Sequence, residues 1–252
     1  MEIAIVVTIS NRAVLITGGN RGIGRALVQE ALRRGAKRVY AGARNALVDS
    51  DSRVTPLTLD ITNAAQIQDS VEKVATLDVL VNNAGLALYD DLSDPAAVQQ
   101  HLAVNLFGTY AVIQAFLPLL AHSGGSIVNN LSVNALAPLP IIPAYSISKA
   151  AAFSLTQSLR VILAAQGVRV HAVLTGPVDT DMTRGLDIPK ASPESVAQSI
   201  FDGVENDEDE IFPDALSQSL TKTWRSGAAK MLEEQYAALL AGRSAVKSSA
   251  AQ

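Results

Sequence analysis

The chain of 252 residues is 48% hydrophobic and 17% charged, which provides enough apolar side chains for one large α/β domain and excludes a disordered or coiled-coil protein. Its net charge of −4 argues against a nucleic-acid partner, because such a partner requires a basic surface. The absence of cysteine excludes disulfides, thiolate catalysis and cysteine-ligated metals. Segment 1–10 is apolar but lacks the basic start of a signal peptide, and no run of about 18 apolar residues follows it. We therefore expect a cytoplasmic protein without a membrane-spanning helix.

Short apolar runs alternate with longer stretches of helical spacing along the chain. The apolar runs predict strands at 13–17, 37–43, 54–59, 78–82, 126–131, 168–174 and 211–212. The helical patterns predict helices at 22–34 and 63–75, one or two helices within 95–120, a long helix at 144–166, one that begins at 193 and one near the C-terminus. Asn63 and Ser192 are the expected N-caps, and Gly167 is expected to end the long helix.

The order of these elements indicates the fold class. Strands that are apolar throughout are buried on both faces, and strands that alternate with helices are joined by right-handed crossovers. The sequence therefore predicts an α/β fold, a doubly wound Rossmann-type parallel sheet of about seven strands with helices on both faces. Because no linker or repeat divides the chain, residues 1–252 are expected to form a single domain with a flexible tail from about residue 243. The acidic run 206–210 is interpreted as a solvated loop and not as a metal site.

A glycine-rich turn connects the first predicted strand to the first helix. It reads Thr17-Gly18-Gly19-Asn20-Arg21-Gly22-Ile23-Gly24. Glycines let the backbone approach a ligand closely, and the helix N-terminus offers free N–H groups and a partial positive charge to an anion. The turn therefore predicts a pyrophosphate site built from Gly18, Asn20, Arg21, Gly22, Ile23 and Gly24.

The end of the second predicted strand indicates which dinucleotide binds. A NAD-binding protein carries an acidic residue about 20 residues after the last glycine, where it binds the ribose 2′-hydroxyl. This chain has Arg44 there instead, and a guanidinium matches a 2′-phosphate. Arg21 can add a second cation. The sequence therefore favours NADP(H) over NAD as the cofactor.

Four motifs that follow one another in the expected order resemble those of the short-chain dehydrogenase/reductases. They are the glycine turn, Asn82-Asn83-Ala84-Gly85 after the fourth strand, Ser132 after the fifth, and Tyr145-Ser146-Ile147-Ser148-Lys149 at the start of the long helix. Asn105 resembles the asparagine that members of this family use in a proton relay. The resemblance covers nearly the whole chain and implies an oxidoreductase of the NADP-preferring carbonyl reductase type.

The resemblance also implies the residues of the site. The catalytic set would be Asn105, Ser132, Tyr145 and Lys149. Beyond the glycine turn and Arg44, the cofactor would contact Asp60, Asn83, Ala84, Gly85, Tyr145, Lys149, Pro177, Val178 and Thr180. Of these, Asp60 would meet the adenine ring, and Asn83 and Ala84 would form the wall beside the adenosine ribose. Val178 and Thr180, in the turn after the sixth strand, would hold the nicotinamide carboxamide. One position departs from the family pattern, because Thr175 stands where a proline usually precedes Gly176. That departure leaves the stiffness of this turn open.

The catalytic residues suit carbonyl reduction on physical grounds. Tyr145 and Lys149 are four residues apart and therefore share one face of a helix. The charge of Lys149 is expected to stabilise a tyrosinate and so to lower the pKa of Tyr145, which would make it a general acid in reduction and a general base in oxidation. Ser132 can donate a hydrogen bond to the carbonyl oxygen where negative charge develops. Asn105 is expected to hold a water that links Lys149 to solvent.

The segment between Ser132 and Tyr145 is apolar apart from Asn134, and in the family it borders the substrate. An apolar aldehyde, ketone or secondary alcohol is the expected small-molecule substrate, because Arg184 is the one evident cation for an acid. The expected lining residues are Val133, Asn134, Leu136, Ile142, Met182 and Leu186.

Two alternative functions stay open. One is reduction of a β-ketoacyl (3-oxoacyl) thioester of fatty-acid synthesis. A dense basic patch that binds an acidic carrier protein would support this function, and the sequence shows no such patch. The other is a regulator that senses NADP(H) without turnover, which has no need of an acid–base tyrosine. The sequence has no motif for a serine hydrolase, because it contains no G-x-S-x-G. It also has no metal-binding motif, because the spacing of His101, His122 and His171 is not that of metal ligands. We therefore assign these histidines structural or surface roles.

The long helix that begins near Tyr145 also predicts an assembly. Its small residues, Ala150, Ala151, Ala152, Ser154 and Ser158, allow another helix to approach closely. Family members often associate through this helix. We therefore expect a homo-oligomer, a tetramer in preference to a dimer.

Overall fold

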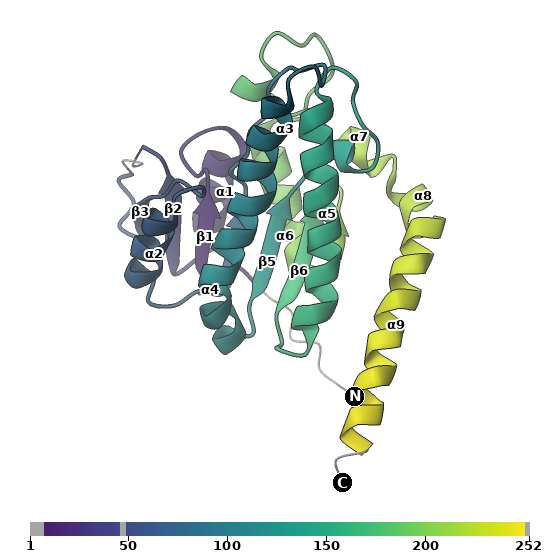
Figure 1. Cartoon of the computed structure of the whole chain (residues 1–252). Coiled ribbons are helices and arrows are strands. Elements are labelled where there is room, and N and C mark those ends of the chain that lie inside the picture. Colours follow the sequence, from purple (N-terminus) through teal and green to yellow (C-terminus); the bar gives the residue numbers. More distant parts are fainter. Residues whose placement is uncertain (1–7, 46–48, 250–252) are drawn as a thin grey trace.

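A single parallel sheet organises the computed structural model, which describes residues 8–45 and 49–249, with side chains up to residue 238 (Figure 1). The expected seven strands form in the order β3-β2-β1-β4-β5-β6-β7, and every neighbouring pair is parallel. The strands are β1 (Ala13–Thr17), β2 (Arg38–Ala43), β3 (Val54–Thr58), β4 (Val79–Asn82), β5 (Ser126–Asn130), β6 (Arg169–Val173) and β7 (Glu210–Ile211). The predicted Rossmann-type fold is confirmed.

Helices cover both faces of the sheet because successive strand residues point to opposite sides. Ile16 and its counterparts in neighbouring strands pack against α1 (Gly22–Arg33) and α6 (Pro193–Glu205). Leu15 and its counterparts pack against α2 (Ala64–Lys73), α4 (Thr109–Ser123) and α5 (Pro143–Ala164). The side chains of Asn63 and Ser192 cap α2 and α6 as expected, each accepting a hydrogen bond from a backbone N–H.

The helical region predicted at 95–120 is one continuous run. It consists of α3 (Pro95–Leu102), a π-helical turn (Ala103–Gly108) and α4. By length and composition alone the run Pro95–Ser123 could cross a membrane. In the fold, however, its side chains Val112, Ile113 and Phe116 are fully buried against the sheet, so its apolar character serves the core.

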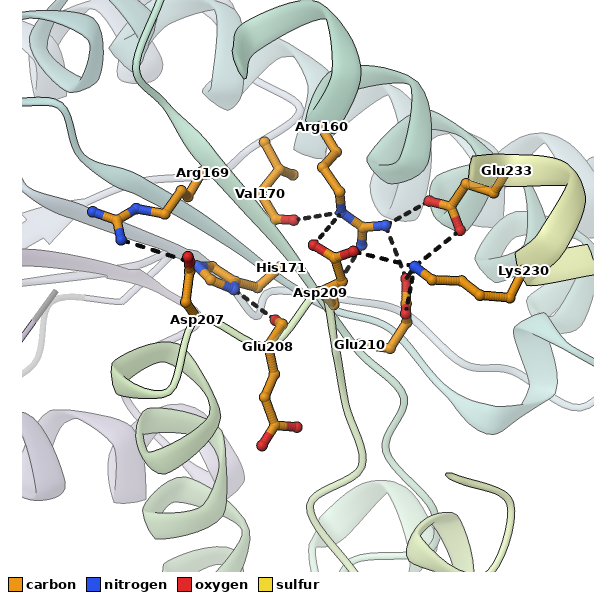
Figure 2. A network of polar contacts seen from close by, with 10 residues as sticks. All are labelled: Arg160, Arg169, Val170, His171, Asp207, Glu208, Asp209, Glu210, Lys230 and Glu233. Carbon is orange, nitrogen blue, oxygen red and sulfur yellow. Dashed lines mark hydrogen bonds and ion pairs between the residues drawn. The ribbon is translucent and has the colours of Figure 1, made fainter. Parts of the chain in front are cut away.

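The acidic run 206–210 is more than the solvated loop that we expected. Its last residue, Glu210, is the first residue of β7 and is buried between two cations (Figure 2). Its carboxylate lies 2.9 Å from the Arg160 guanidinium and 2.9 Å from the Lys230 ammonium. Both cations also pair with Glu233, and together they offset the cost of burying the Glu210 carboxylate.

This ionic network joins the C-terminal helices to the sheet edge. Beyond β7 the chain forms α7 (Ala215–Gln218), α8 (Thr221–Arg225) and α9 (Ala228–Ser249). Lys230 and Glu233 lie in the first two turns of α9, which runs beside α5 in Figure 1. We predicted a flexible tail from about residue 243, and the structure continues α9 through that point to Ser249. The apolar start that we noted at 1–10 lies mostly outside the described residues.

Candidate active site

The glycine turn meets the geometric requirements of a pyrophosphate cradle. Gly18 has a φ of 68°, a backbone conformation that favours glycine. A Cβ on Gly24 would lie 2.0 Å from the Gly18 carbonyl oxygen, so no side chain fits there. Arg21 precedes α1 in an extended conformation, and no side chain caps this helix. The first turn of α1 therefore keeps N–H donors for an anionic ligand, as a nucleotide pyrophosphate requires.

The two arginines predicted to bind a 2′-phosphate, Arg44 and Arg21, differ in their interactions. Arg44 follows β2 directly and is exposed. It lies close to Asp60, whose pKa is held below its usual value first by hydrogen bonds from Thr62 and additionally by the charge of Arg44. Arg21 instead pairs with Asp181 at 3.1 Å, an exposed contact that a phosphate can replace.

The segment after β4 is fixed against the glycine turn. The backbone N–H groups of Asn83 and Ala84 both donate to the Thr17 hydroxyl at 3.0 Å. The Asn83 amide also donates to the Thr17 carbonyl oxygen at 3.0 Å. A Cβ on Gly85 would lie 3.3 Å from the Asn105 side-chain oxygen and 3.8 Å from Lys149 Nζ. The predicted adenosine wall therefore leads directly into the predicted catalytic residues.

The four predicted catalytic residues converge at the carboxyl edge of the sheet. Ser132 follows β5, and Tyr145 and Lys149 lie in the first turns of α5. Lys149 Nζ lies 5.6 Å from the centre of the Tyr145 ring and donates to the Asn130 carbonyl oxygen at 2.9 Å. Asn105 lies on the π-helical turn, a distortion that is frequent at functional sites.

The side chain of Asn105 ties two segments of the site together. Its amide nitrogen donates to the Leu86 carbonyl oxygen and to the Ser148 hydroxyl, each at 2.8 Å. Its oxygen accepts a hydrogen bond from the Leu86 N–H, also at 2.8 Å. Asn105 therefore holds the loop after β4 against α5, a role that the sequence alone did not indicate.

Burial sets the proton affinities of Tyr145 and Lys149. It raises the pKa of Tyr145 to about 12, although an interaction with the Ser132 side chain acts in the opposite direction. Burial also lowers the pKa of Lys149 to about 8, and the partner of its ammonium is the neutral carbonyl oxygen of Asn130. We expected a lowered pKa for Tyr145, and in the protein alone the opposite holds, since desolvation outweighs the interaction with the Ser132 side chain.

The turn after β6 is held firmly in place without the usual proline. The Thr175 carbonyl oxygen accepts the Val133 N–H at 3.0 Å, and the Gly176 N–H donates to the buried Asp214 carboxylate at 2.7 Å. Val178 is buried, and Thr180 reaches over the glycine turn, where its methyl group would lie 3.2 Å from a Cβ on Gly22. Of the predicted contacts in this turn, Thr180 is thus the one that the structure places beside the cradle.

The comparisons with known proteins agree with this geometry. Residues 12–190 match the family model described as short chain dehydrogenase. The chain belongs to the short-chain dehydrogenase family. It is an oxidoreductase of that family, whose members act on CH–OH or C=O groups with a nicotinamide cofactor.

Individual relatives of this dehydrogenase cover most of its length. A short-chain dehydrogenase of Burkholderia cenocepacia, solved in complex with NADP, is 36% identical with a TM-score of 0.82 and covers 87% of this chain and 95% of its own. The 2-(S)-hydroxypropyl-CoM dehydrogenase 3 of Xanthobacter autotrophicus is 33% identical over 76% of this chain and 82% of its own. An uncharacterized oxidoreductase of Staphylococcus epidermidis is 33% identical over 78% of this chain and 90% of its own.

The residues of the predicted substrate wall differ in their burial and packing. Val133 and Asn134 form a short 3-10 turn after Ser132, and the Ser132 hydroxyl accepts the Asn134 N–H at 3.1 Å. Leu136 packs onto a core cluster with Leu131 and Phe153, so it also supports the fold. The other three predicted lining residues, Ile142, Met182 and Leu186, border the loops above the sheet edge; Met182 is exposed, and Ile142 and Leu186 are partly buried.

Two features of the dehydrogenase site were not predicted. Exposed apolar side chains of the loop after β4, Leu88 and Tyr89, lie at the same edge as the predicted wall. His101 is fully buried, with its ring 6.3 Å from that of Tyr145; its Nε2 accepts the Leu88 N–H at 3.0 Å and its Nδ1 donates to the Ala97 carbonyl oxygen at 2.7 Å. His101 thus has the structural role that we assigned to it, but it lies beside the predicted catalytic tyrosine, a position that a lone histidine in a helical pattern could not indicate.

A cavity of about 560 Å³ flanks the cradle and not Ser132 and Tyr145. It lies between the start of α1 and segment 179–194, and its lining includes Arg21, Arg25, Arg184 and Lys190. Arg25 is held by Asp49 at 2.6 Å, and Arg21 and Arg184 both pair with Asp181, so that three of these four cations already have a carboxylate partner. The cavity therefore belongs to the pyrophosphate side of the site.

Proposed function

We propose that this protein is an NADPH-dependent reductase that transfers hydride to an apolar aldehyde or ketone, with Tyr145 as the general acid. The observation that carries the proposal is the convergence of Ser132, Tyr145 and Lys149 beside a glycine cradle that no side chain fills. When bound, NADP(H) supplies the hydride. The residues of the chain would bind the nucleotide, orient the carbonyl and deliver the proton.

Tyr145 is protonated at neutral pH, as the direction of reduction requires. A group with a pKa of about 12 keeps its proton throughout the physiological pH range, as a general acid must before the carbonyl oxygen needs it. The Ser132 hydroxyl would donate a hydrogen bond to the same oxygen, where negative charge develops. In the proposed reaction, Tyr145 Oη gives its proton to that oxygen as the carbonyl becomes an alcohol.

Lys149 would stabilise the tyrosinate that remains after this transfer. At 5.6 Å from the ring, an ammonium attracts a negative charge by about 3 kcal/mol at an effective dielectric constant of about 20. With a pKa of about 8, Lys149 is also able to give up a proton near neutral pH. We propose that it returns a proton to Tyr145, and that Asn105 positions the water that connects Lys149 to solvent.

Arg44 and Arg21 support the choice of NADP(H) over NAD(H). Arg44 is exposed directly after β2, where it can contact a 2′-phosphate, and Arg21 is held only by an exposed ion pair. The Burkholderia cenocepacia relative was solved with NADP, which is consistent with this proposal. Asp60 is present after β3, but its carboxylate is engaged with Thr62.

The loops at the sheet edge support an apolar substrate. Leu88, Tyr89, Ile141 and Met182 all expose large apolar side chains there. Arg184, the one cation that we considered for an acidic substrate, is 81% exposed and paired with Asp181. A substrate carboxylate would therefore have to compete with a protein carboxylate for a solvated guanidinium, which is unfavourable.

We also propose that the protein forms a homo-oligomer, a tetramer, through α5. The helix exposes Ile147 and Ile162, with the small residues Ser154 and Ser158 exposed between them. Such a surface lets a second helix approach closely and bury apolar area. Light scattering at the mass of one chain would refute the assembly.

The function is tested by titrating the protein with NADPH and NADH and following NADPH absorbance with ketones, aldehydes and a β-ketoacyl thioester. Turnover on an apolar ketone or aldehyde supports the proposal, and turnover on the thioester alone would favour fatty-acid synthesis. Tight binding without turnover on any class would indicate a sensor. Failure to bind either nucleotide would refute a catalytic or a sensing role.

The variant Tyr145→Phe separates these outcomes. We expect its turnover to fall by roughly 10²- to 10⁴-fold, because it loses the proton donor, while its affinity for NADPH stays near that of the wild type. Tyr40→Phe is the matched control, since Tyr40 is also buried but packs in the core cluster on β2. Similar losses in both variants would show that the hydroxyl of Tyr145 has no special role.

A further inference from the structure

Side chains form a string of hydrogen bonds across the carboxyl ends of four neighbouring strands, β1, β4, β5 and β6. The Thr175 hydroxyl, just beyond β6, donates to Asn130 Oδ1 at 2.7 Å. Asn130 Nδ2, at the end of β5, donates to Asn83 Oδ1 at 3.0 Å. Asn83 Nδ2, just beyond β4, donates to the Thr17 carbonyl oxygen at 3.0 Å. The string thus begins at the turn after β6 and ends at the glycine turn.

Asn130 is the central member of this string. Its backbone carbonyl oxygen accepts the hydrogen bond from Lys149 Nζ, so one residue holds both the string and the catalytic lysine. Thr175 and Asn130 are buried, 5% and 9% exposed, and water therefore cannot readily replace a lost partner. In addition, Asn83 Nδ2 would lie 2.6 Å from a Cβ on Gly24, so any shift of Asn83 reaches the pyrophosphate cradle.

A second string in the same sheet provides a comparison. Asn82 Nδ2 donates to Asn129 Oδ1, and Asn129 Nδ2 donates to the Thr156 hydroxyl, each at 2.9 Å. Thr156 is fully buried, and its hydroxyl donates in turn to the Ala152 carbonyl oxygen within α5. Because successive strand residues point to opposite faces, this string runs along the other side of β4 and β5 and does not reach the glycine turn.

We propose that Asn130 and Thr175 are positioning residues that couple the nicotinamide end of the nucleotide site to its adenosine end. The inference rests on the proposed NADP(H) function. The hydroxyl of Thr175 takes the place of the proline ring that usually stiffens this turn. It fixes the turn by a bond to Asn130, and Asn130 transmits the same restraint to Asn83 and Lys149.

The proposal predicts an effect at a distance. Removal of the Thr175 hydroxyl leaves Asn130 Oδ1 without its donor, so that the Asn130 amide is free to turn away from Asn83. Asn83 then loses a partner at the adenosine end, although nothing there has been mutated. A ligand that occupies only the adenosine end should therefore bind less tightly when a residue at the nicotinamide end is changed.

The test is calorimetric titration of Thr175→Val with NADPH and with adenosine 2′,5′-bisphosphate, which lacks the nicotinamide. We expect both affinities to fall by roughly three- to tenfold, the effect of one hydrogen bond. Thr175→Ser, which keeps the hydroxyl, should restore both. Thr156→Val, the same substitution in the second string, should change neither. Thr175→Ala serves as a further hydroxyl-free variant if the valine prevents folding.

Three results would overturn the proposal while the wild type binds NADPH normally. They are unchanged affinities in Thr175→Val, a loss confined to NADPH, and an equal loss in Thr156→Val. A double-mutant cycle with Asn130→Ala adds a direct measure: if Thr175 acts through Asn130, the two losses will not add, and additive losses would refute the coupling. Absence of NADPH binding in the wild type would instead refute the proposed function, and with it the inference.

Discussion

Lys149 is expected to destabilise the fold that it serves, and Lys149→Met tests this directly. Burial lowers its pKa from 10.5 to about 8 in the folded protein. At about 1.36 kcal/mol for each pH unit, this difference corresponds to about 3 kcal/mol of unfavourable free energy at neutral pH, where the buried ammonium is charged. Methionine removes that charge but leaves the Asn130 carbonyl oxygen without its donor, at a cost of about 1 kcal/mol. The variant should therefore be more stable by about 2 kcal/mol.

The two pKa values of Lys149 also determine how the stability of the protein changes with pH. Because the folded pKa lies below the unfolded one, the unfolded chain binds more protons between pH 8 and 10.5, and the stability of the wild type rises with pH across that window. The advantage of Lys149→Met should accordingly be present at pH 7 and disappear as the pH approaches about 10.5. Urea unfolding of both proteins at pH 7, 9 and 10, without nucleotide, measures it.

The outcome also bears on the trade-off between stability and activity. At pH 7 the midpoint of thermal unfolding should rise by about 4 to 8 °C, while turnover is lost because the tyrosinate loses its counter-charge. A variant that is less stable than the wild type at pH 7 would refute the argument. So would a difference in stability that stays constant from pH 7 to 10.

Three further substitutions test other parts of the structure. Gly24→Ala should abolish measurable NADPH binding in a titration, because its Cβ would lie 2.0 Å from the Gly18 carbonyl oxygen; near-normal affinity would contradict the cradle geometry. Arg44→Asp should weaken NADPH by roughly ten- to hundredfold and leave NADH nearly unchanged, whereas Arg38→Asp, at the opposite end of β2, should alter neither. Glu210→Gln should lower the free energy of unfolding by roughly 3 kcal/mol, since it removes the buried carboxylate between Arg160 and Lys230; an unchanged urea midpoint would show that Glu233 alone suffices.

Local sequence patterns predicted most of the fold and the shape of the cradle. The apolar run Ala13–Thr17 can be buried on both faces only as a central strand, and the glycines that follow it can serve only a tight turn. Tyr145 and Lys149 had to share a helix face because they are four residues apart. Each of these predictions depends on neighbours in the sequence.

The parts that the sequence did not predict depend on residues that are distant along the chain. The pKa of Tyr145 rises because the folded chain buries it away from water, and no local sequence pattern predicts that burial. Glu210 looked like part of a solvated acidic run because Arg160 and Lys230, which compensate it, come from α5 and α9. The sequence showed that Thr175 replaces the proline usual in the family, but it could not show the hydrogen-bond partner of Thr175, because Asn130 lies 45 residues away.

The parallel sheet also gives the molecule an electrostatic polarity that its composition conceals. With every strand running in the same direction, α1, α5 and α6 begin above the same edge and direct the positive ends of their peptide dipoles toward the nucleotide site. Their opposite ends lie at the far edge of the sheet, where Arg33 occupies the last turn of α1. An acidic chain with a net charge of −4 can in this way present a locally cation-like surface to a polyanionic cofactor. The attraction of the nucleotide thus follows from the common direction of the strands and helices. Substitutions elsewhere on the surface can change the net charge of the protein without removing this attraction.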